Sequence, residues 1–210
     1  MSMHVISWEE YLYMGTGETP LAVTIGVFDG VHRGHQSLIQ RICTVSSPDP
    51  CSPSSPLPTP HSLLPTSPPL PTVITFRQNP LQILKPKAFA GDIMTLEQKI
   101  GIFELLGVQL TVLIDFSAEF SKIKGRDFIS LLLDSKPVQL IVLGRNFRCG
   151  QGLDTGVEEI QSLAEARGVN ACIMPPLMDG DQPVSSSRIR QALAAGRITE
   201  AERLLGRPIG

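Results

Sequence analysis

The sequence predicts an α/β fold in which helices cover both faces of a parallel sheet. Short apolar runs rich in Val, Ile and Leu have the length of buried strands, and they alternate with longer stretches whose apolar residues recur at helical spacing. Ligands of such folds bind beyond the carboxyl ends of the strands, where the strand order reverses. The sequence therefore predicts a Rossmann-like architecture, with a binding site among the segments that follow the strands.

The first strand is expected at 21–27, where LAVTIGV is apolar on both faces, as in buried parallel strands. In the segment after it, Leu38, Ile39 and Ile42 recur at the spacing of a helix. Four further runs are apolar or β-branched and predict the remaining strands. In chain order these lie at 72–76, 109–116, 138–144 and 169–175.

Capping signals and glycines mark the later helices. Thr95 and Gln98 fit the capping-box pattern, in which two side chains satisfy free N–H groups of the first turn, and Gly107 stands where the helix should end. We therefore expect a helix from Thr95 to about Leu106. Further helices are expected at 125–135, at 157–168 and, in two pieces separated near Gly196, within 185–206.

The segment 46–71 differs from the rest of the chain because it is dominated by proline and serine. Proline lacks a backbone N–H and is excluded from helix interiors and inner strands, so this segment cannot join a core. We interpret it as a disordered insertion within a single domain spanning 1–210. Recognition by a proline-binding partner is the functional alternative, and Cys51 and His61 inside the segment are assigned no role.

Composition narrows the class of protein. A formal net charge of -2 argues against a general nucleic-acid binder, which needs a basic surplus. The longest apolar runs are strand-sized, far short of a membrane span, and the first residues lack the pattern of a signal peptide. The four cysteines form no CxxC pair, and a disulfide framework is not expected in a chain of this length. We expect a cytoplasmic protein with reduced thiols and neither nucleic-acid nor membrane partners.

The stretch GVFDGVHRGH follows the first strand and enters the first helix. Gly26, Gly30 and Gly34 let the backbone approach a ligand, and the first turn of a helix attracts phosphate through unpaired N–H groups and the helix dipole. His32 and His35, three residues apart, lie on one side of that turn, at its mouth rather than in the core, and can donate to phosphoryl oxygens. Two alternatives are that these histidines only cap a helix, or that they bind zinc with further ligands that the sequence does not show.

Four stretches together resemble one family. GVFDGVHRGH is similar to the GxFDGxHxGH signature of the nucleotidyltransferase superfamily, TFRQNP occupies the place of TFEPHP, LGRNFRCG resembles GxDFxFG, and VSSSRIR resembles SSTxIR. Their order and spacing cover almost the whole chain outside the insertion. The chain therefore resembles the FMN adenylyltransferase (FAD synthetase) module of bacterial bifunctional riboflavin kinase/FAD synthetases.

This resemblance implies a fold of the nucleotidyltransferase type and transfer of AMP from ATP to FMN, giving FAD and pyrophosphate with Mg²⁺. His32 and His35 would contact the ATP phosphates, and Arg188 would reach the β- and γ-phosphates from a second helix with Ser186 or Ser187 as its N-cap. Asn146 would help to hold the phosphates or the metal. Solvated charge for Arg188 and a simple turn for Asn146 are the structural alternatives.

The resemblance also implies the binding side of the site. Gly26 and Phe28 would line the adenosine pocket, mostly through their backbone, and Gly34 would belong to the same phosphate-binding turn. Asp29 is expected to orient the loop rather than to act as a base. No protein ligand for a metal is assigned, and ATP and FMN are the expected partners.

Two departures from the family pattern leave alternatives open. Where the family has Phe-Glu-Pro-His-Pro, this chain has Arg77, Gln78 and Asn79 between Phe76 and Pro80, so flavin affinity or acceptor identity could differ. The family continues into a riboflavin kinase domain, for which 1–210 shows no motif. Besides FMN adenylyltransferase, we therefore consider an adenylyltransferase for pantetheine phosphate or nicotinate mononucleotide, and a nucleotide- or flavin-binding module without turnover.

Overall fold

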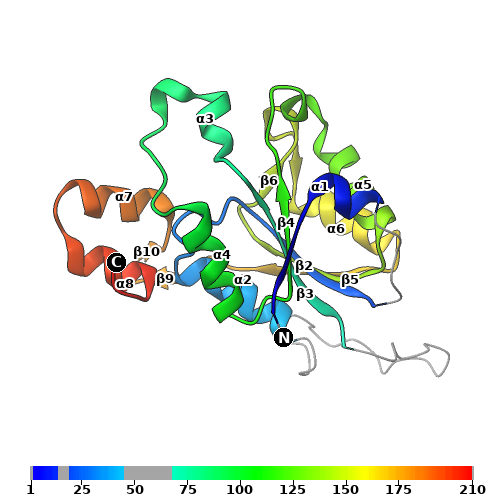
Figure 1. Cartoon of the computed structure of the whole chain (residues 1–210), viewed down its shortest axis with the longest axis horizontal. Helices are drawn as coiled ribbons and strands as arrows, with labels where there is room; N and C mark the ends of the chain where they lie inside the picture. The colour runs from blue at the N-terminus through cyan, green and yellow to red at the C-terminus, as the bar shows by residue number, and fades with distance from the viewer. Residues whose placement is uncertain (1, 14–18, 45–67, 210) are drawn as a thin grey trace.

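The computed structural model describes residues 2–13, 19–44 and 68–209. Their centre is a six-stranded parallel sheet of order β1-β4-β3-β2-β5-β8 (Figure 1). The strands are β1 (His4–Ser7), β2 (Leu21–Ile25), β3 (Leu70–Phe76), β4 (Leu110–Ile114), β5 (Val138–Gly144) and β8 (Asn170–Met174). From β2 the chain adds β3 and β4 on one side, and then β5 and β8 on the other. The predicted fold class is confirmed, and the strand order reverses between β2 and β5.

Helices cover both faces of this sheet (Figure 1). On one face Trp8, Phe128 and Ile160 pack in a cluster with β2, β3 and β5, and on the other Ile39 and Phe103 pack in a second cluster. The first face carries α1 (Trp8–Tyr13), α5 (Gly125–Ser135) and α6 (Val157–Glu165); the second carries α2 (Arg33–Cys43) and α4 (Leu96–Leu105). Because apolar strands meet helices on both sides, β2 is buried along its whole length.

A helix pair lies beside α2, away from the sheet (Figure 1). α7 (Ser186–Ala194) and α8 (Ile198–Leu205) form a separate small core around Ile189 and Leu204. The Gln36 side chain in α2 donates to the carbonyl of Leu205 at 2.8 Å, which attaches this pair to the main body. A hairpin of β9 (Met178–Asp179) and β10 (Gln182–Pro183) leads into α7.

Most predicted elements are present, with three differences. The sequence predicted five strands and missed β1, which pairs with β4 at the edge of the sheet, together with the adjoining α1. It also missed α3 (Pro80–Leu84), which follows β3, and the short pairs β9/β10 and β6/β7 (Arg148–Cys149 and Thr155–Gly156). The predicted insertion reached 71, but Leu70 and Pro71 belong to β3, because both residues lie in register with the neighbouring strand β2. The stretch 46–67, with Cys51 and His61, lies outside the described residues.

Two expectations about composition can be compared with the described residues. Within those ranges no helix is long and apolar enough to cross a membrane. Cys43 and Cys149, both within the described ranges, are free thiols, as expected.

Candidate active site

The loop between β2 and α2 is held in an unusual backbone conformation. Phe28 and Val31 both have positive φ, at 52° and 36°, a region that residues with a Cβ rarely adopt. The Phe28 ring is fully buried and packs edge-on against Phe103, with ring centroids 5.6 Å apart. A Cβ on Gly26 would lie 3.2 Å from this ring, so glycine is favoured where the chain leaves β2. The Phe28 ring therefore belongs to the core that packs against this face of the sheet.

His32 caps α2. Its Nδ1 accepts a hydrogen bond from the His35 N–H at 3.3 Å, so in the neutral ring the proton resides on Nε2, which is left to donate. The two imidazoles stack with centroids 3.6 Å apart and planes 17° from parallel. A Cβ on Gly34 would come within 3.3 Å of the His32 ring, so this glycine makes room for the stack.

Both histidines are neutral at pH 7. Burial lowers the pKa of His32 to about 4, and burial together with the charges of His32 and Lys99 lowers the pKa of His35 well below its ordinary value. His32 stands at the N-cap of α2, as expected for a residue at the mouth of the helix, but it is only 6% exposed and so is more buried than that position suggested. Nδ1 of His35 is buried and has no hydrogen-bond partner among the described residues.

Asp29 connects the loop to α7. Its Oδ1 accepts from the Ile93 N–H at 2.9 Å, its Oδ2 pairs with Arg190, and its carbonyl accepts from the Ser186 hydroxyl at 2.8 Å. Arg190 also donates to the Gly91 carbonyl at 3.1 Å. Burial raises the pKa of Asp29 although these partners oppose the shift. Such contacts suit a residue that orients the loop.

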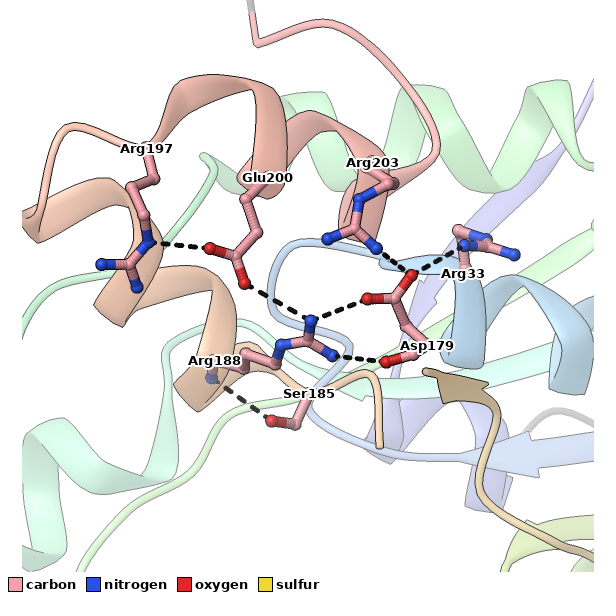
Figure 2. Close-up of polar contacts among 7 residues, drawn as sticks. All are labelled: Arg33, Asp179, Ser185, Arg188, Arg197, Glu200 and Arg203. Carbon is pink, nitrogen blue, oxygen red and sulfur yellow. Dashed lines mark hydrogen bonds and ion pairs between the residues drawn. The ribbon is translucent and has the colours of Figure 1, made fainter. Parts of the chain in front are cut away.

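The residue that caps α7 lies just before the two serines predicted for this role. Ser185 is the N-cap, and its hydroxyl accepts from the Arg188 N–H at 3.3 Å (Figure 2). The prediction that Ser186 or Ser187 caps this helix is wrong, because the Ser186 hydroxyl is directed to Asp29 and Ser187 is exposed within the first turn. Ser185, the observed cap, was not among the predicted candidates.

Arg188 lies in a network of ion pairs (Figure 2). Its guanidinium donates to Oδ2 of Asp179 at 2.7 Å and to Glu200 at 3.4 Å. Asp179 also pairs with Arg33 in α2 and Arg203 in α8. The bonds from Arg203 and Arg188 hold the pKa of Asp179 below its usual range. One carboxylate thus occupies the space between arginines from the first turns of α2 and α7, and the contacts of Arg188 are with carboxylates rather than with the histidines.

Asn146 lies in an exposed turn after β5. The turn is closed by hydrogen bonds from the Arg145 N–H to the Met174 carbonyl at 2.9 Å and from the Phe147 N–H to the Gly144 carbonyl at 2.8 Å. Because β5 neighbours β2, this turn and the histidine loop lie on the two sides of the point where the strand order reverses. The structure therefore places Asn146 at the same edge of the sheet as His32, without a contact between them.

Sequence reasoning missed Lys99. Its side chain is 8% exposed, and its ammonium donates to the carbonyls of Phe76 at 3.0 Å and Val27 at 3.3 Å and to the Thr75 hydroxyl at 3.3 Å. Burial lowers the pKa of Lys99 to about 8. Its position four residues before buried Phe103, on the inner face of α4, is the signal that could have identified it.

The chain is similar to proteins of one family. Residues 16–52 and 67–188 match the family model described as FAD synthetase. The chain belongs to the FAD synthetase family. It is 26% identical over 187 residues to the FAD synthetase of Listeria monocytogenes, covering 89% of this chain and 68% of that protein. It is 28% identical over 187 residues to the bifunctional riboflavin kinase/FMN adenylyltransferase of Escherichia coli K12, covering 89% of this chain and 54% of that protein.

These matches confirm the resemblance to the family. The chain spans about half the length of the bifunctional relatives. A solved structure named Macrolide-efflux Protein from Streptococcus pneumoniae superposes with a TM-score of 0.77 at 25% identity, covering 98% of this chain and 62% of that one. It supports the same α/β fold.

Proposed function

We propose that this member of the FAD synthetase family transfers AMP from ATP to FMN. The observation that carries the proposal is the hydrogen bond from the Ser186 hydroxyl to the Asp29 carbonyl at 2.8 Å. It joins the first turn of α7 to the loop that enters α2, so the positive ends of two helices lie close together at the reversal of strand order. A polyphosphate is the natural ligand of such a pair of helix N-termini.

The reaction suits the charge state of these residues. A phosphate oxygen of FMN attacks the α-phosphorus of ATP, the bond between that phosphorus and the bridging oxygen breaks, and pyrophosphate leaves. FMN phosphate is already an anion at neutral pH, so no general base is needed. The site must instead stabilise charge on the α-phosphate and on pyrophosphate. Neutral imidazoles of His32 and His35 supply N–H donors for this purpose without exchanging a proton.

The remaining residues are proposed to hold ATP. Backbone groups of Gly26 and Phe28 border the adenosine, with Gly34 in the phosphate-binding turn, and Asn146 contacts the phosphates from the opposite side. Arg188 reaches the β- and γ-phosphates by exchanging its bond to Asp179 for phosphoryl oxygens. Ser186 and Ser187 belong to the first turn of α7, whose free N–H groups face the same anion.

Mg²⁺ is proposed to arrive bound to ATP. In the part of the chain that the structure describes, no three His, Cys, Asp or Glu side chains are grouped as a metal site. Mg²⁺ generally keeps much of its coordination on substrate phosphates and water. ATP and FMN are the proposed partners, and the cytoplasm is the proposed compartment.

An acceptor panel tests the proposal. The purified chain, ATP and Mg²⁺ are incubated separately with FMN, riboflavin, pantetheine phosphate and nicotinate mononucleotide, and the products are resolved by chromatography. We expect FAD from FMN, and no FMN from riboflavin, because 1–210 shows no kinase motif. An adenylylated product from another acceptor would change the substrate. FMN bound without any product would support a binding module instead.

A further inference from the structure

Arg77 stands at the carboxyl end of β3, directly after Phe76, in the stretch that departs most from the family pattern. Its backbone is fixed: the Arg77 N–H donates to the Ile114 carbonyl at 2.9 Å. The next side chain, Gln78, donates to Oδ1 of Asp115 at 2.6 Å and to the Phe116 carbonyl at 2.8 Å. The backbone that carries the guanidinium is therefore anchored to the end of the neighbouring strand β4.

Asn79 fixes the other end of this short segment. Its Oδ1 accepts from the Leu81 N–H at 3.1 Å as the N-cap of α3, and its Nδ2 donates to Asp92 at 2.9 Å. By contrast, the exposed guanidinium of Arg77 has no hydrogen bond or ion pair with any residue in 2–13, 19–44 or 68–209. The segment is thus rigid at the backbone and carries an unpaired cation.

This cation borders a small pocket of about 30 Å³ at the ends of β2 and β3. Of the two acids that line the pocket, Asp29 is paired with Arg190, and Asp92 accepts hydrogen bonds from the neutral amides of Asn79 and, at 3.2 Å, Gln82, without an ion pair to Arg77. The second cation of the pocket, Lys99, donates to three neutral oxygens. The positive charge of Arg77 is therefore available to a ligand.

The proposed reaction requires an anion on this side. In-line displacement places the attacking oxygen opposite the leaving pyrophosphate. With the triphosphate at the N-termini of α2 and α7, which meet at Asp29 after β2, the acceptor phosphate is expected beside it, in the pocket that Asp29 and Arg77 both line. We propose that Arg77 is a specificity-determining residue that binds the phosphate monoester of the acceptor nucleotide, and this inference rests on the proposed function.

The test measures binding rather than turnover. The full chain is titrated with FMN and with riboflavin, which differ by the phosphate, and quenching of flavin fluorescence gives each Kd without ATP. Arg77→Gln removes the cation. Lys87→Gln, an exposed position ten residues later in the same region and outside the pocket, makes the same change in net charge.

We expect Arg77→Gln to weaken FMN binding by roughly 10-fold or more, the usual effect of losing a charge-assisted hydrogen bond, and to leave riboflavin within twofold. Lys87→Gln should change neither. An FMN Kd within twofold of the parent, an equal loss for both flavins, or a parent that does not prefer FMN would overturn the inference. Phosphate-dependent binding without FAD formation would contradict the proposed reaction but not the role of Arg77.

Discussion

Arg190 of α7 forms an ion pair with Asp29, which lies in the loop that enters α2. The two side chains are 23% and 7% exposed, so the pair is shielded from water on the side of the acid. This contact and the Ser186 hydroxyl bond to the same residue are the bonds through which α7 is fixed to the histidine loop. The positions of the two helix N-termini relative to one another therefore depend on this pair.

Replacing Arg190 by methionine should destabilise the protein strongly. Arg190→Met leaves Asp29 buried without its counter-charge, and breaking a buried pair from one side costs about 3–5 kcal/mol. Burial already raises the pKa of Asp29, and the loss of Arg190 raises it further. The deficit should therefore narrow as the pH falls and Asp29 becomes protonated.

Urea unfolding of the parent and Arg190→Met at pH 7 and pH 5 measures this effect. The double variant Asp29→Asn with Arg190→Met is the matched control, since it removes the uncompensated charge and should regain part of the loss. Equal deficits at both pH values would show that the charge of Asp29 is not what Arg190 stabilises.

His32 combines two roles that one substitution can separate. Asparagine is a strong N-cap, so His32→Asn should keep the cap of α2 but lose the Nε2 donor. We expect turnover of FAD synthesis to fall by about 10²–10³, the usual effect of losing one such donor. His32→Ala should lose a similar factor and, in addition, about 1 kcal/mol of stability from the missing cap. Activity of His32→Asn within twofold of the parent would remove His32 from the mechanism.

The low pKa of His32 predicts a signed dependence of stability on pH. The ordinary pKa of 6.5 applies to the unfolded chain, and burial lowers the folded value to about 4. Between these values the unfolded state binds more protons, so the folded state loses stability as pH falls, by roughly 1.4 kcal/mol for each pH unit. His32→Asn has no such group and should lose less between pH 6.5 and pH 4. Parallel stability curves for the two proteins would contradict the assignment of a neutral, buried ring.

The carboxylate of Asp179 should compete with the phosphates of ATP for the guanidinium of Arg188. This carboxylate is 9% exposed and is shared by Arg33, Arg188 and Arg203. Phosphoryl oxygens must replace it on Arg188 if that residue binds ATP. Asp179→Asn weakens the competitor while keeping its size, so the KM for ATP should fall severalfold and become more sensitive to salt. Steady-state kinetics at two ionic strengths measure this, and a higher KM would show that Asp179 instead holds Arg188 in its binding position.

Local signals explain which parts of the fold could be predicted. The capping box of Thr95 and Gln98 is present with both hydrogen bonds, and Gly107 adopts a φ of 90° after α4, because these features depend on neighbours within a few residues. β1 was missed because it has only four residues and is half-exposed at the sheet edge. Short strands of this kind carry no clear apolar pattern.

The parts of the site that could not be predicted depend on tertiary contacts. The sequence pointed to Ser186 or Ser187 as the N-cap of α7, but the Ser186 hydroxyl bonds to Asp29 and Ser185 caps the helix instead. Arg188 and Arg190 are two residues apart in one helix, so they point in different directions, one to Asp179 and the other to Asp29. The sequence motif could locate the two helix N-termini but not which acid each arginine meets.

Lys99 provides a test of the strand ends beneath the site. Its ammonium bonds to the carbonyls of Val27 and Phe76, which follow β2 and end β3, and so holds two neighbouring strand ends together. Lys99→Met keeps most of the side-chain volume but loses these bonds. We expect FAD synthesis to decrease because the loop that carries the histidines starts at Val27.

The pH dependence of Lys99→Met separates this electrostatic role from packing. Burial lowers the folded pKa of Lys99 from 10.5 to about 8, so between these values the unfolded state binds more protons and the parent gains stability as pH rises. The variant cannot make this gain. The parent should therefore become more stable relative to Lys99→Met by roughly 1.4 kcal/mol per pH unit between pH 8 and 10.5, as measured by urea unfolding. A constant difference over this range would mean that Lys99 titrates as an ordinary exposed lysine and is not held in the buried position between the two strands.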